Sequence, residues 1–373
     1  MKLDIKVITG GLLQTNRAEG RSRGQDMVKA AVLYKVNEPL RIDELIVPEL
    51  KPGQVLVKVA YSGVCRSQLN EVCGLKGEDK FLPHTLGHEG SGIVEAIGEG
   101  VKKVKIGDHV VLTWIKGIGI DVTSSSYKTK AGTIVNSGAI STFLTKAVIS
   151  ENRLVKIPKK MPLREAALLG CAIPTGAGVV INTIKMPADS SIAIFGAGGI
   201  GLSVLLAAKI KGASVIIVID ISDDKLEKSI QFGATHIINA AKRDVLSAIM
   251  EITSQKGLDY AIECAGKRET MEIAFRSVKD KNGLCVIAGN LPKGETISID
   301  PFDLIKGKQI IGTWGGETNP ENDISVYIDW YLKGKLELSN LITHCYKLDQ
   351  INEALDSLSQ GNAGRILIDM REE

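Results

Sequence analysis

The segment that decides the fold is Ser191-Ile-Ala-Ile-Phe-Gly-Ala-Gly-Gly-Ile-Gly201, an apolar run that leads directly into closely spaced glycines. The run Ser191–Phe195 shows no polar alternation, which is typical of a strand buried on both faces. Residues Gly201–Lys211 predict the helix that follows it. The glycines therefore lie in the turn between a buried strand and a helix, where many folds bind a phosphate group.

Each glycine of this Gly-x-Gly-x-x-Gly pattern has its own physical reason. Gly196 permits a tight turn, Gly198 lets the backbone approach a pyrophosphate, and Gly201 lets helix and strand pack closely. The start of the helix adds unpaired N–H groups and a positive potential. A turn that serves packing alone would also need glycines. The residues after the turn therefore decide whether it binds a phosphate group or only allows close packing. The candidate dinucleotide-binding residues of the turn are Gly196, Gly198, Gly199, Ile200 and Gly201.

A carboxylate follows the next strand. Val215–Ile219 is another apolar run, and Asp220 comes directly after it, roughly 20 residues beyond the last glycine. A carboxylate there accepts hydrogen bonds from the hydroxyl groups of an adenosine ribose and would repel a 2′-phosphate. Strand, glycines, helix and acid occur in the required order, and together they predict a site for NAD rather than NADP.

The second half of the chain repeats this alternation. Asp224–Phe232, which ends at Gly233, predicts a helix, and Asp259–Glu263 and Leu284–Ala288 predict further strands. Apolar strands separated by helices are typical of a parallel sheet covered on both faces. We therefore expect an α/β domain from about Leu163 onward.

The first half has a different pattern. From Ala30 to Ile157, short apolar stretches are broken repeatedly by glycine and proline. Within it, residues 55–60 alternate as they would in a strand with two different faces. The pattern predicts a compact β domain, either a barrel or a sandwich. Arg365–Asp369 predicts one more strand near the C-terminus.

Length and composition exclude several classes of protein. A chain of 373 residues exceeds one simple core, so two lobes are expected. Its hydrophobic (44%) and charged (24%) shares are those of a globular protein, and its net charge of +3 does not indicate a nucleic-acid or membrane partner. No apolar run approaches the ~20 residues that cross a bilayer. Six cysteines suit a reducing, cytoplasmic location, and residues 1–26 are expected to be an N-terminal extension without a secretory pattern.

Three separated residues are candidate metal ligands. Cys65 and His88 lie in the first half, and Cys171 lies where the two patterns meet. Thiolate and imidazole are zinc ligands, and three of them leave the fourth tetrahedral position open for water or substrate. The long spacings prove nothing alone, because an isolated cysteine is more often a small buried hydrophobe and an isolated histidine a core residue. Glycines beside all three favour converging loops. Four other cysteines lack such neighbours and are interpreted as structural: Cys73, Cys264, Cys285 and Cys345.

Together these motifs resemble those of the zinc-dependent medium-chain alcohol dehydrogenases. The resemblance spans about Met27 to Met370. Within the family, the chain is similar above all to the longer-loop branch of alcohol and glutathione-dependent formaldehyde dehydrogenases. Its motifs are Cys65-Arg-Ser67, Gly87-His-Glu-Gly90, Gly107-Asp108, Gly170-Cys171 and the glycine turn.

The resemblance implies an α/β fold class made of two domains. A GroES-like β-barrel catalytic domain would occupy 27–173, and residues 314–373 would return to complete it. Between them, 174–313 would form a Rossmann domain with a doubly wound parallel sheet. The implied reaction transfers a hydride between an alcohol and NAD to give an aldehyde or ketone plus NADH, in a homodimer or homotetramer.

The same resemblance implies roles for single residues. Cys65, His88 and Cys171 would hold one catalytic zinc, with the Glu89 carboxylate behind it, and Ser67 would lie next to the substrate oxygen. The further implied roles are a proton-relay position at Asn70, pyrophosphate contacts from Arg66 and Arg365, adenosine-ribose contacts from Asp220 and Lys225, and a substrate pocket with Thr113 and Trp114.

The chain departs from the family pattern at three places. No cysteine occurs between Cys73 and Cys171, so we expect no structural zinc. Gln68 stands where a carboxylate usually orients the histidine ligand, and an amide supplies less negative charge. Asn70 stands where a relay histidine is common, and asparagine cannot titrate near neutral pH.

Two alternative functions remain beside the dehydrogenase. A zinc-free reductase of the quinone or enone type would share the fold but would not need the cysteine and histidine ligands. A non-catalytic NAD-binding protein with a decayed site would explain Gln68 and Asn70. The dehydrogenase ranks first because all three ligands and Glu89 are present.

Overall fold

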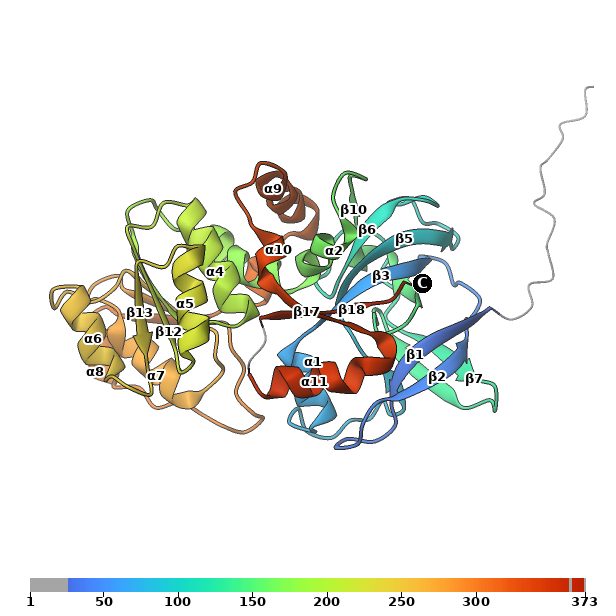
Figure 1. Ribbon diagram of the computed structural model, residues 1–373, viewed down its shortest axis with the longest axis horizontal. Coiled ribbons are helices and arrows are strands. Elements are labelled where there is room, and N and C mark those ends of the chain that lie inside the picture. Colours follow the sequence, from blue (N-terminus) through green and yellow to red (C-terminus); the bar gives the residue numbers. More distant parts are fainter. Residues whose placement is uncertain (1–25, 362–363, 372–373) are drawn as a thin grey trace, which may run out of the picture.

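The computed structural model describes residues 26–361 and 364–371. Figure 1 shows two lobes side by side, one of parallel strands flanked by helices and one of barrel strands, with the C-terminus in the barrel lobe. All but the last residue of the predicted extension 1–26 lies outside the described residues. Within them no single helix is long and apolar enough to cross a membrane, and the bent pair Leu163–Gly170 and Ala172–Thr183 meets that test by length and composition.

A six-stranded parallel sheet forms the centre of one lobe, in the order β13-β12-β11-β14-β15-β16. Because β11 comes first in the chain yet lies inside the sheet, the strand order reverses beside it, and open sheets bind ligands at that reversal. The strands are β11 (Ser191–Phe195), β12 (Val215–Asp220), β13 (His236–Asn239), β14 (Tyr260–Glu263), β15 (Leu284–Ile287) and β16 (Gln309–Gly312).

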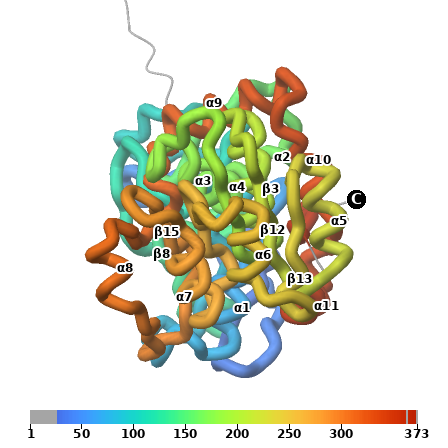
Figure 2. Tube along the Cα trace, turned by 90° about the vertical axis from the view of Figure 1, so that its left-hand side faces the viewer, coloured from blue at the N-terminus to red at the C-terminus, as the bar shows by residue number. Residues whose placement is uncertain are grey.

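Helices cover both faces of this sheet, as Figure 2 shows in a view onto the lobe. Ile192 and Ile194 of β11 belong to the core that includes α4 and α5, whereas Ala193 and Phe195 belong to the core that includes α6 and α7. This confirms the doubly wound α/β arrangement predicted from the continuous apolar strands. The helices are α4 (Gly199–Ile210), α5 (Asp223–Phe232), α6 (Val245–Ile252), α7 (Arg268–Ser277) and α8 (Pro301–Ile305).

The other lobe contains a closed barrel and a second sheet. The barrel order is β1-β2-β7-β8-β4, and the sheet order is β10-β6-β5-β3-β18-β17 with β9 also paired to β3. A barrel is therefore present, one of the two β architectures that the sequence left open. The strands are β1 (Met27–Leu33), β2 (Arg41–Ile46), β3 (Gln54–Val64), β4 (His84–Thr85), β5 (Glu89–Ile97), β6 (His109–Thr113), β7 (Ser125–Thr129), β8 (Ile134–Gly138), β9 (Lys146–Ser150), β10 (Leu154–Ile157), β17 (Ile342–Lys347) and β18 (Arg365–Asp369).

The end of the chain returns to this barrel lobe. β18 pairs in antiparallel register with β3, with Ile366 opposite Val64. Arg365 precedes Ile366 in β18, and Cys65 directly follows Val64 at the end of β3. The register therefore brings the end of the chain to the start of the candidate site. The remaining helical elements are α1 (Arg66–Val72), η1 (Glu151–Arg153), α2 (Leu163–Ala166), η2 (Ala167–Gly170), α3 (Ala172–Gly178), η3 (Val179–Thr183), η4 (Gly315–Glu317), α9 (Pro320–Leu332), α10 (Leu338–Leu341), η5 (Leu348–Gln350) and α11 (Ile351–Ser359).

Candidate active site and metal centre

Three segments that are distant in sequence bring their ligand atoms together. Cys65 lies between β3 and α1, His88 directly precedes β5, and Cys171 lies between η2 and α3. The Sγ atoms of the two cysteines and a ring nitrogen of His88 all lie within 4.8 Å of one another. His88 Nε2 is 3.3 Å from Cys171 Sγ. Two sulfurs and one imidazole at this spacing suit zinc, with one coordination position left for another molecule.

Glycines allow these segments to come so close. Gly87 has a φ of +91°, which other residues rarely adopt. A Cβ at Gly170 would overlap the carbonyl oxygen of Leu112, and a Cβ at Gly63 would lie 2.5 Å from the carboxyl carbon of Glu89. The glycines noted in the sequence therefore serve close packing around the triad.

The two cysteines differ in their protonation. A hydrogen bond with Cys171 lowers the pKa of the Cys65 thiol well below its usual value, and His88 and Arg365 act in the same direction against burial. The same hydrogen bond with Cys65, together with burial, raises the pKa of Cys171 well above its usual value. Cys65 is thus the readier thiolate, the form in which cysteine binds metal.

Glu89 and Arg365 form an ion pair behind the triad. Glu89 is fully buried, and its Oε1 accepts a hydrogen bond from Arg365 Nη2. Burial raises the pKa of Glu89, although Arg365 acts to lower it. Nε of Arg365 is buried and has no hydrogen-bond partner within the described residues. That unpaired donor is suited to an anion that approaches from the glycine turn.

Gln68 joins two of the metal-ligand segments. Its Oε1 accepts a hydrogen bond from the backbone N–H of Cys65 at 3.0 Å, and its Nε2 is hydrogen-bonded to Nδ1 of His88. The side chain is buried, with 2% of its surface exposed. An amide therefore takes the position behind the histidine ring that a carboxylate was expected to occupy in related proteins.

The other predicted residues of the loop lie on α1. Ser67 and Asn70 are half-buried, and Arg66 is exposed. All three lie within five residues of Cys65, on the helix that begins at the triad. Their predicted roles toward substrate and pyrophosphate stay predictions.

Aromatic rings lie against the triad on one side. Trp114 meets the ring of His88 edge-on at 6.4 Å between centroids, and it meets Trp314 at 5.2 Å. Trp314 was missed by the sequence reasoning, because it follows β16, a short strand that the apolar pattern did not indicate. Thr113 is buried, and its hydroxyl donates to the carbonyl oxygen of Gly170 at 2.7 Å. Thr113 therefore holds the loop before Cys171, and its hydroxyl proton is not free for a substrate.

The glycine turn has the shape of a phosphate cradle. Gly196 has a φ of +98°, and a Cβ at Gly201 would overlap the carbonyl oxygen of Gly196. Gly198 caps α4, and a Cβ there would meet no atom within 4 Å, so the side from which a ligand could approach is open. A Cβ at Gly199 would lie 2.6 Å from Cδ of Arg365. The turn and the metal triad therefore share Arg365 as a neighbour.

Asp220 and Lys225 lie close to the turn. Asp220 Oδ2 accepts a hydrogen bond from the backbone N–H of Ala197 at 2.8 Å, and its Oδ1 accepts one from Ile221 at 2.8 Å. Lys225 lines a cavity of about 60 Å³ together with Ala197. The carboxylate thus fixes the glycine turn, and Lys225 lies at the same edge of the sheet.

Comparison with known proteins agrees with this site. Residues 51–159 match the alcohol dehydrogenase GroES-like domain, and residues 199–333 match the zinc-binding dehydrogenase family. The chain is 34% identical over 371 residues to an S-(hydroxymethyl)glutathione dehydrogenase of Komagataella pastoris, covering 92% of this chain and 97% of the relative.

Solved structures agree over most of the chain. An alcohol dehydrogenase zinc-binding domain protein from Burkholderia ambifaria superposes with a TM-score of 0.87 at 32% identity, and the benzyl alcohol dehydrogenase of Acinetobacter calcoaceticus with 0.84 at 33%. Each match covers 93% of this chain and 100% of the other. Together with the sulfur and imidazole donors beside a glycine cradle, these likenesses show that the chain belongs to the zinc-dependent medium-chain alcohol dehydrogenases and is an oxidoreductase of that family.

Proposed function

We propose that this protein is an NAD-dependent zinc alcohol dehydrogenase, which transfers a hydride between a small alcohol and NAD to give an aldehyde or ketone and NADH. The observation that carries the proposal is the convergence of Cys65, His88 and Cys171 next to a glycine cradle. A zinc-free reductase would have no need for two sulfurs and an imidazole within 4.8 Å.

The proposed metal content is one catalytic zinc and no structural zinc. The triad supplies three donors, as catalytic zinc sites do. No cysteine occurs between Cys73 and Cys171. In the barrel lobe the buried carboxylate of Glu151 accepts backbone hydrogen bonds from Lys102, Lys103 and Ile120, which ties the segments around it together.

The proposed cofactor is NAD rather than NADP. Asp220 ends β12 beside the glycine turn, where its negative charge would repel a 2′-phosphate. Lys225 stands at the same edge and could donate to a ribose hydroxyl. Arg365, whose Nε next to Gly199 has no hydrogen-bond partner among the described residues, supplies positive charge for a pyrophosphate.

Zinc, when bound, supplies a Lewis acid for the substrate oxygen, and NAD supplies the hydride acceptor. The chain's own groups would orient the substrate and move its proton. Ser67, two residues after Cys65, would accept the proton of the alcohol and pass it toward the cofactor ribose and solvent. Asn70 can hydrogen-bond in such a relay but cannot itself store the proton. Trp114, which contacts His88, would form a wall of the pocket and limit substrate width.

The proposed partner is a second copy of this chain, in a homodimer or homotetramer of the cytoplasm. β16 is an edge strand, so one side of its backbone is available for pairing. Large apolar side chains are exposed near it: 77% for Ile305, 57% for Phe302 and 76% for Trp314. An exposed edge strand with apolar neighbours suits a symmetric contact between two such lobes. Six cysteines, all free thiols, suit a reducing compartment.

A substrate screen on protein of known zinc content tests the proposal. The panel contains primary and secondary alcohols, S-(hydroxymethyl)glutathione and benzyl alcohol, and the readout is NADH absorbance. We expect turnover with NAD and one zinc per chain, lost in Cys65→Ala and His88→Ala. Undiminished turnover in these two variants would favour the zinc-free reductase. NADH binding without turnover of any substrate, with zinc supplied, would favour the non-catalytic protein.

A further inference from the structure

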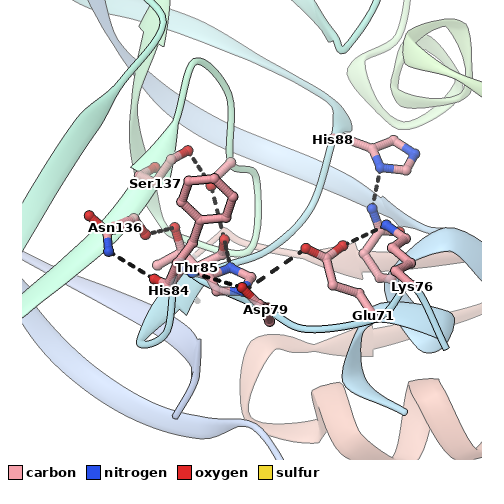
Figure 3. A network of polar contacts seen from close by, with 11 residues as sticks. Glu71, Lys76, Asp79, His84, Thr85, His88, Asn136 and Ser137 are labelled. Atoms are coloured by element: carbon pink, nitrogen blue, oxygen red, sulfur yellow. Dashed lines mark hydrogen bonds and ion pairs between the residues drawn. The ribbon is translucent and has the colours of Figure 1, made fainter. Parts of the chain in front are cut away.

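We propose that Glu71, Asp79 and His84 form a second divalent-cation site, separate from the cysteine–histidine triad. One ligand atom from each residue lies within 4.8 Å of the others. His84 Nε2 is 2.8 Å from Asp79 Oδ2 and 4.0 Å from Glu71 Oε1. Figure 3 shows the three side chains pointing toward one another, Glu71 from α1 and His84 from β4.

Each ligand is held from behind by a different partner. Nδ1 of His84 is 3.1 Å from the carbonyl oxygen of Thr85. Asp79 Oδ1 accepts a hydrogen bond from the backbone N–H of Phe81, and Glu71 Oε2 accepts one from Lys76. Each side chain thus uses one of its two polar atoms for an outer contact, namely Nδ1 of His84, Oδ1 of Asp79 and Oε2 of Glu71. Its second polar atom faces the proposed cation position. Metal sites commonly show this pattern, in which outer partners orient the ligands.

One tautomer of His84 is suited to binding a cation. Its ring is nine-tenths buried, and both ring nitrogens face oxygen atoms that accept hydrogen bonds. A neutral imidazole carries one proton and satisfies only one of them. With that proton on Nδ1, the lone pairs of Nε2 and Asp79 Oδ2 face each other at 2.8 Å. A metal ion between these two atoms would bind both lone pairs, whereas in the other tautomer Nε2–H donates to Asp79 and Nδ1 faces the Thr85 carbonyl oxygen without a proton. The Glu71 oxygen on the same side supplies a third ligand atom for the metal.

The donor set indicates which metals would bind. One imidazole and two carboxylates suit first-row divalent ions such as Mn²⁺ or Zn²⁺, whereas the two thiolates of the triad select zinc. Ligand atoms about 2.1 Å from such an ion lie roughly 3.0–3.4 Å apart. The ring of His84 and the carboxylate of Asp79 need only separate slightly, and Glu71, which is more exposed, can rotate inward.

The site opens onto a cavity that also borders the triad. A cavity of about 340 Å³ is lined by Glu71 and His84 and, elsewhere on its wall, by Gln68 and His88. A cation held by three protein atoms keeps positions free for water or for an oxygen of a molecule in this cavity. The second site therefore stands on the wall of the space next to the catalytic centre.

Titration with Mn²⁺ distinguishes the second cation site from the cysteine–histidine triad, because thiolates bind Zn²⁺ in preference to Mn²⁺. Protein that holds one zinc per chain is titrated with Mn²⁺, and free Mn²⁺ is followed by electron paramagnetic resonance. We expect one bound Mn²⁺ per chain, with zinc content unchanged. Asp79→Asn and Glu71→Gln, which keep side-chain shape, should weaken this binding at least ~10-fold.

Glu78→Gln is the matched control, since Glu78 is an exposed acid one residue from Asp79. It removes the same charge and should leave Mn²⁺ affinity unchanged. No binding up to millimolar Mn²⁺, or equal affinity in Asp79→Asn and wild type, would overturn the proposal and leave a hydrogen bond between His84 and Asp79 as the whole interaction. The measurement needs no turnover, so its result tests the second cation site independently of the proposed dehydrogenase activity.

Discussion

Arg365 donates from Nη2 to Oε1 of Glu89 in a buried ion pair, and its side chain also lies against Gly199 of the glycine turn. Glu89 lies behind the metal triad, and Gly199 begins the helix of the phosphate cradle. One guanidinium thus connects the two halves of the candidate active site, contributed by β18, the last strand of the chain.

Arg365→Met should destabilise the protein by about 3–5 kcal/mol, because it leaves the Glu89 charge buried without a partner. Burial already raises the pKa of Glu89, and the variant should raise it further. A carboxyl whose folded pKa is raised stabilises the fold below its unfolded pKa, and that contribution is lost as pH rises through the folded value. Urea unfolding at pH 5 and pH 8 should show the larger deficit at pH 8. The double variant with Glu89→Gln should recover much of the loss, and a deficit equal to the single variant's would contradict this account.

Gly198→Ala and Gly201→Ala should separate cofactor binding from folding. A methyl group at Gly198 meets no protein atom, so the fold should tolerate it while the approach of a pyrophosphate is blocked. A methyl group at Gly201 overlaps the Gly196 carbonyl and should cost about 1–3 kcal/mol of stability. Melting temperature and NADH fluorescence titration measure the two effects. Wild-type NADH affinity in Gly198→Ala would count against the cradle.

Sequence patterns predicted the centre of the cofactor lobe better than its edges. Ser191–Phe195 is apolar throughout because it is covered on both faces, and Gly233, with a φ of +112°, marks the end of α5 as expected. β16 escaped prediction because Gln309–Gly312 is a short, largely exposed edge strand without alternation. Predicted and observed helix starts differ by one or two residues, as frayed helix ends usually do.

The site was predictable only where residues belong to a motif. The convergence of Cys65, His88 and Cys171 followed from family resemblance, since their long spacings carry no geometric information. The contact of Arg365 with Glu89 joins residues 276 positions apart, and no local pattern indicates it. The cluster at Glu71 and His84 lies across irregular chain between α1 and β4, where spacing does not report proximity.

Gln68→Glu should make zinc dissociate about 10-fold more slowly. The Gln68 oxygen is engaged by the Cys65 backbone, so its NH₂ group faces Nδ1 of His88. A histidine that offers Nε2 to a metal carries its proton on Nδ1 and needs an acceptor there. Glutamate has the same length and offers one carboxylate oxygen to the Cys65 backbone N–H and the other to Nδ1 of His88. Zinc transfer to a colorimetric chelator measures the rate. Gln68→Met, which removes both contacts, should release zinc faster than wild type, and equal rates for the Glu and Met variants would contradict the argument.

Glu151→Gln should destabilise the barrel lobe by about 1–3 kcal/mol at neutral pH, because an amide offers one acceptor oxygen where three backbone N–H groups now bind. Burial acts to raise the pKa of Glu151, but hydrogen bonds from Ile120, Lys103 and Lys102 outweigh it and lower the pKa from its usual 4.5.

A carboxyl whose folded pKa is lowered stabilises the fold above its unfolded pKa, and that contribution is lost as pH falls through the folded value. The stability gap between wild type and Glu151→Gln should therefore be widest near pH 7 and shrink below about pH 4.5, as measured by urea unfolding. Glu99→Gln, an exposed acid of the same lobe, is the control and should change stability little at either pH. A gap that stays constant with pH would show that the Glu151 charge does not hold these segments. If the stability difference between wild type and Glu151→Gln shrinks at low pH only in zinc-free protein, a metal ion rather than the Glu151 charge connects these segments.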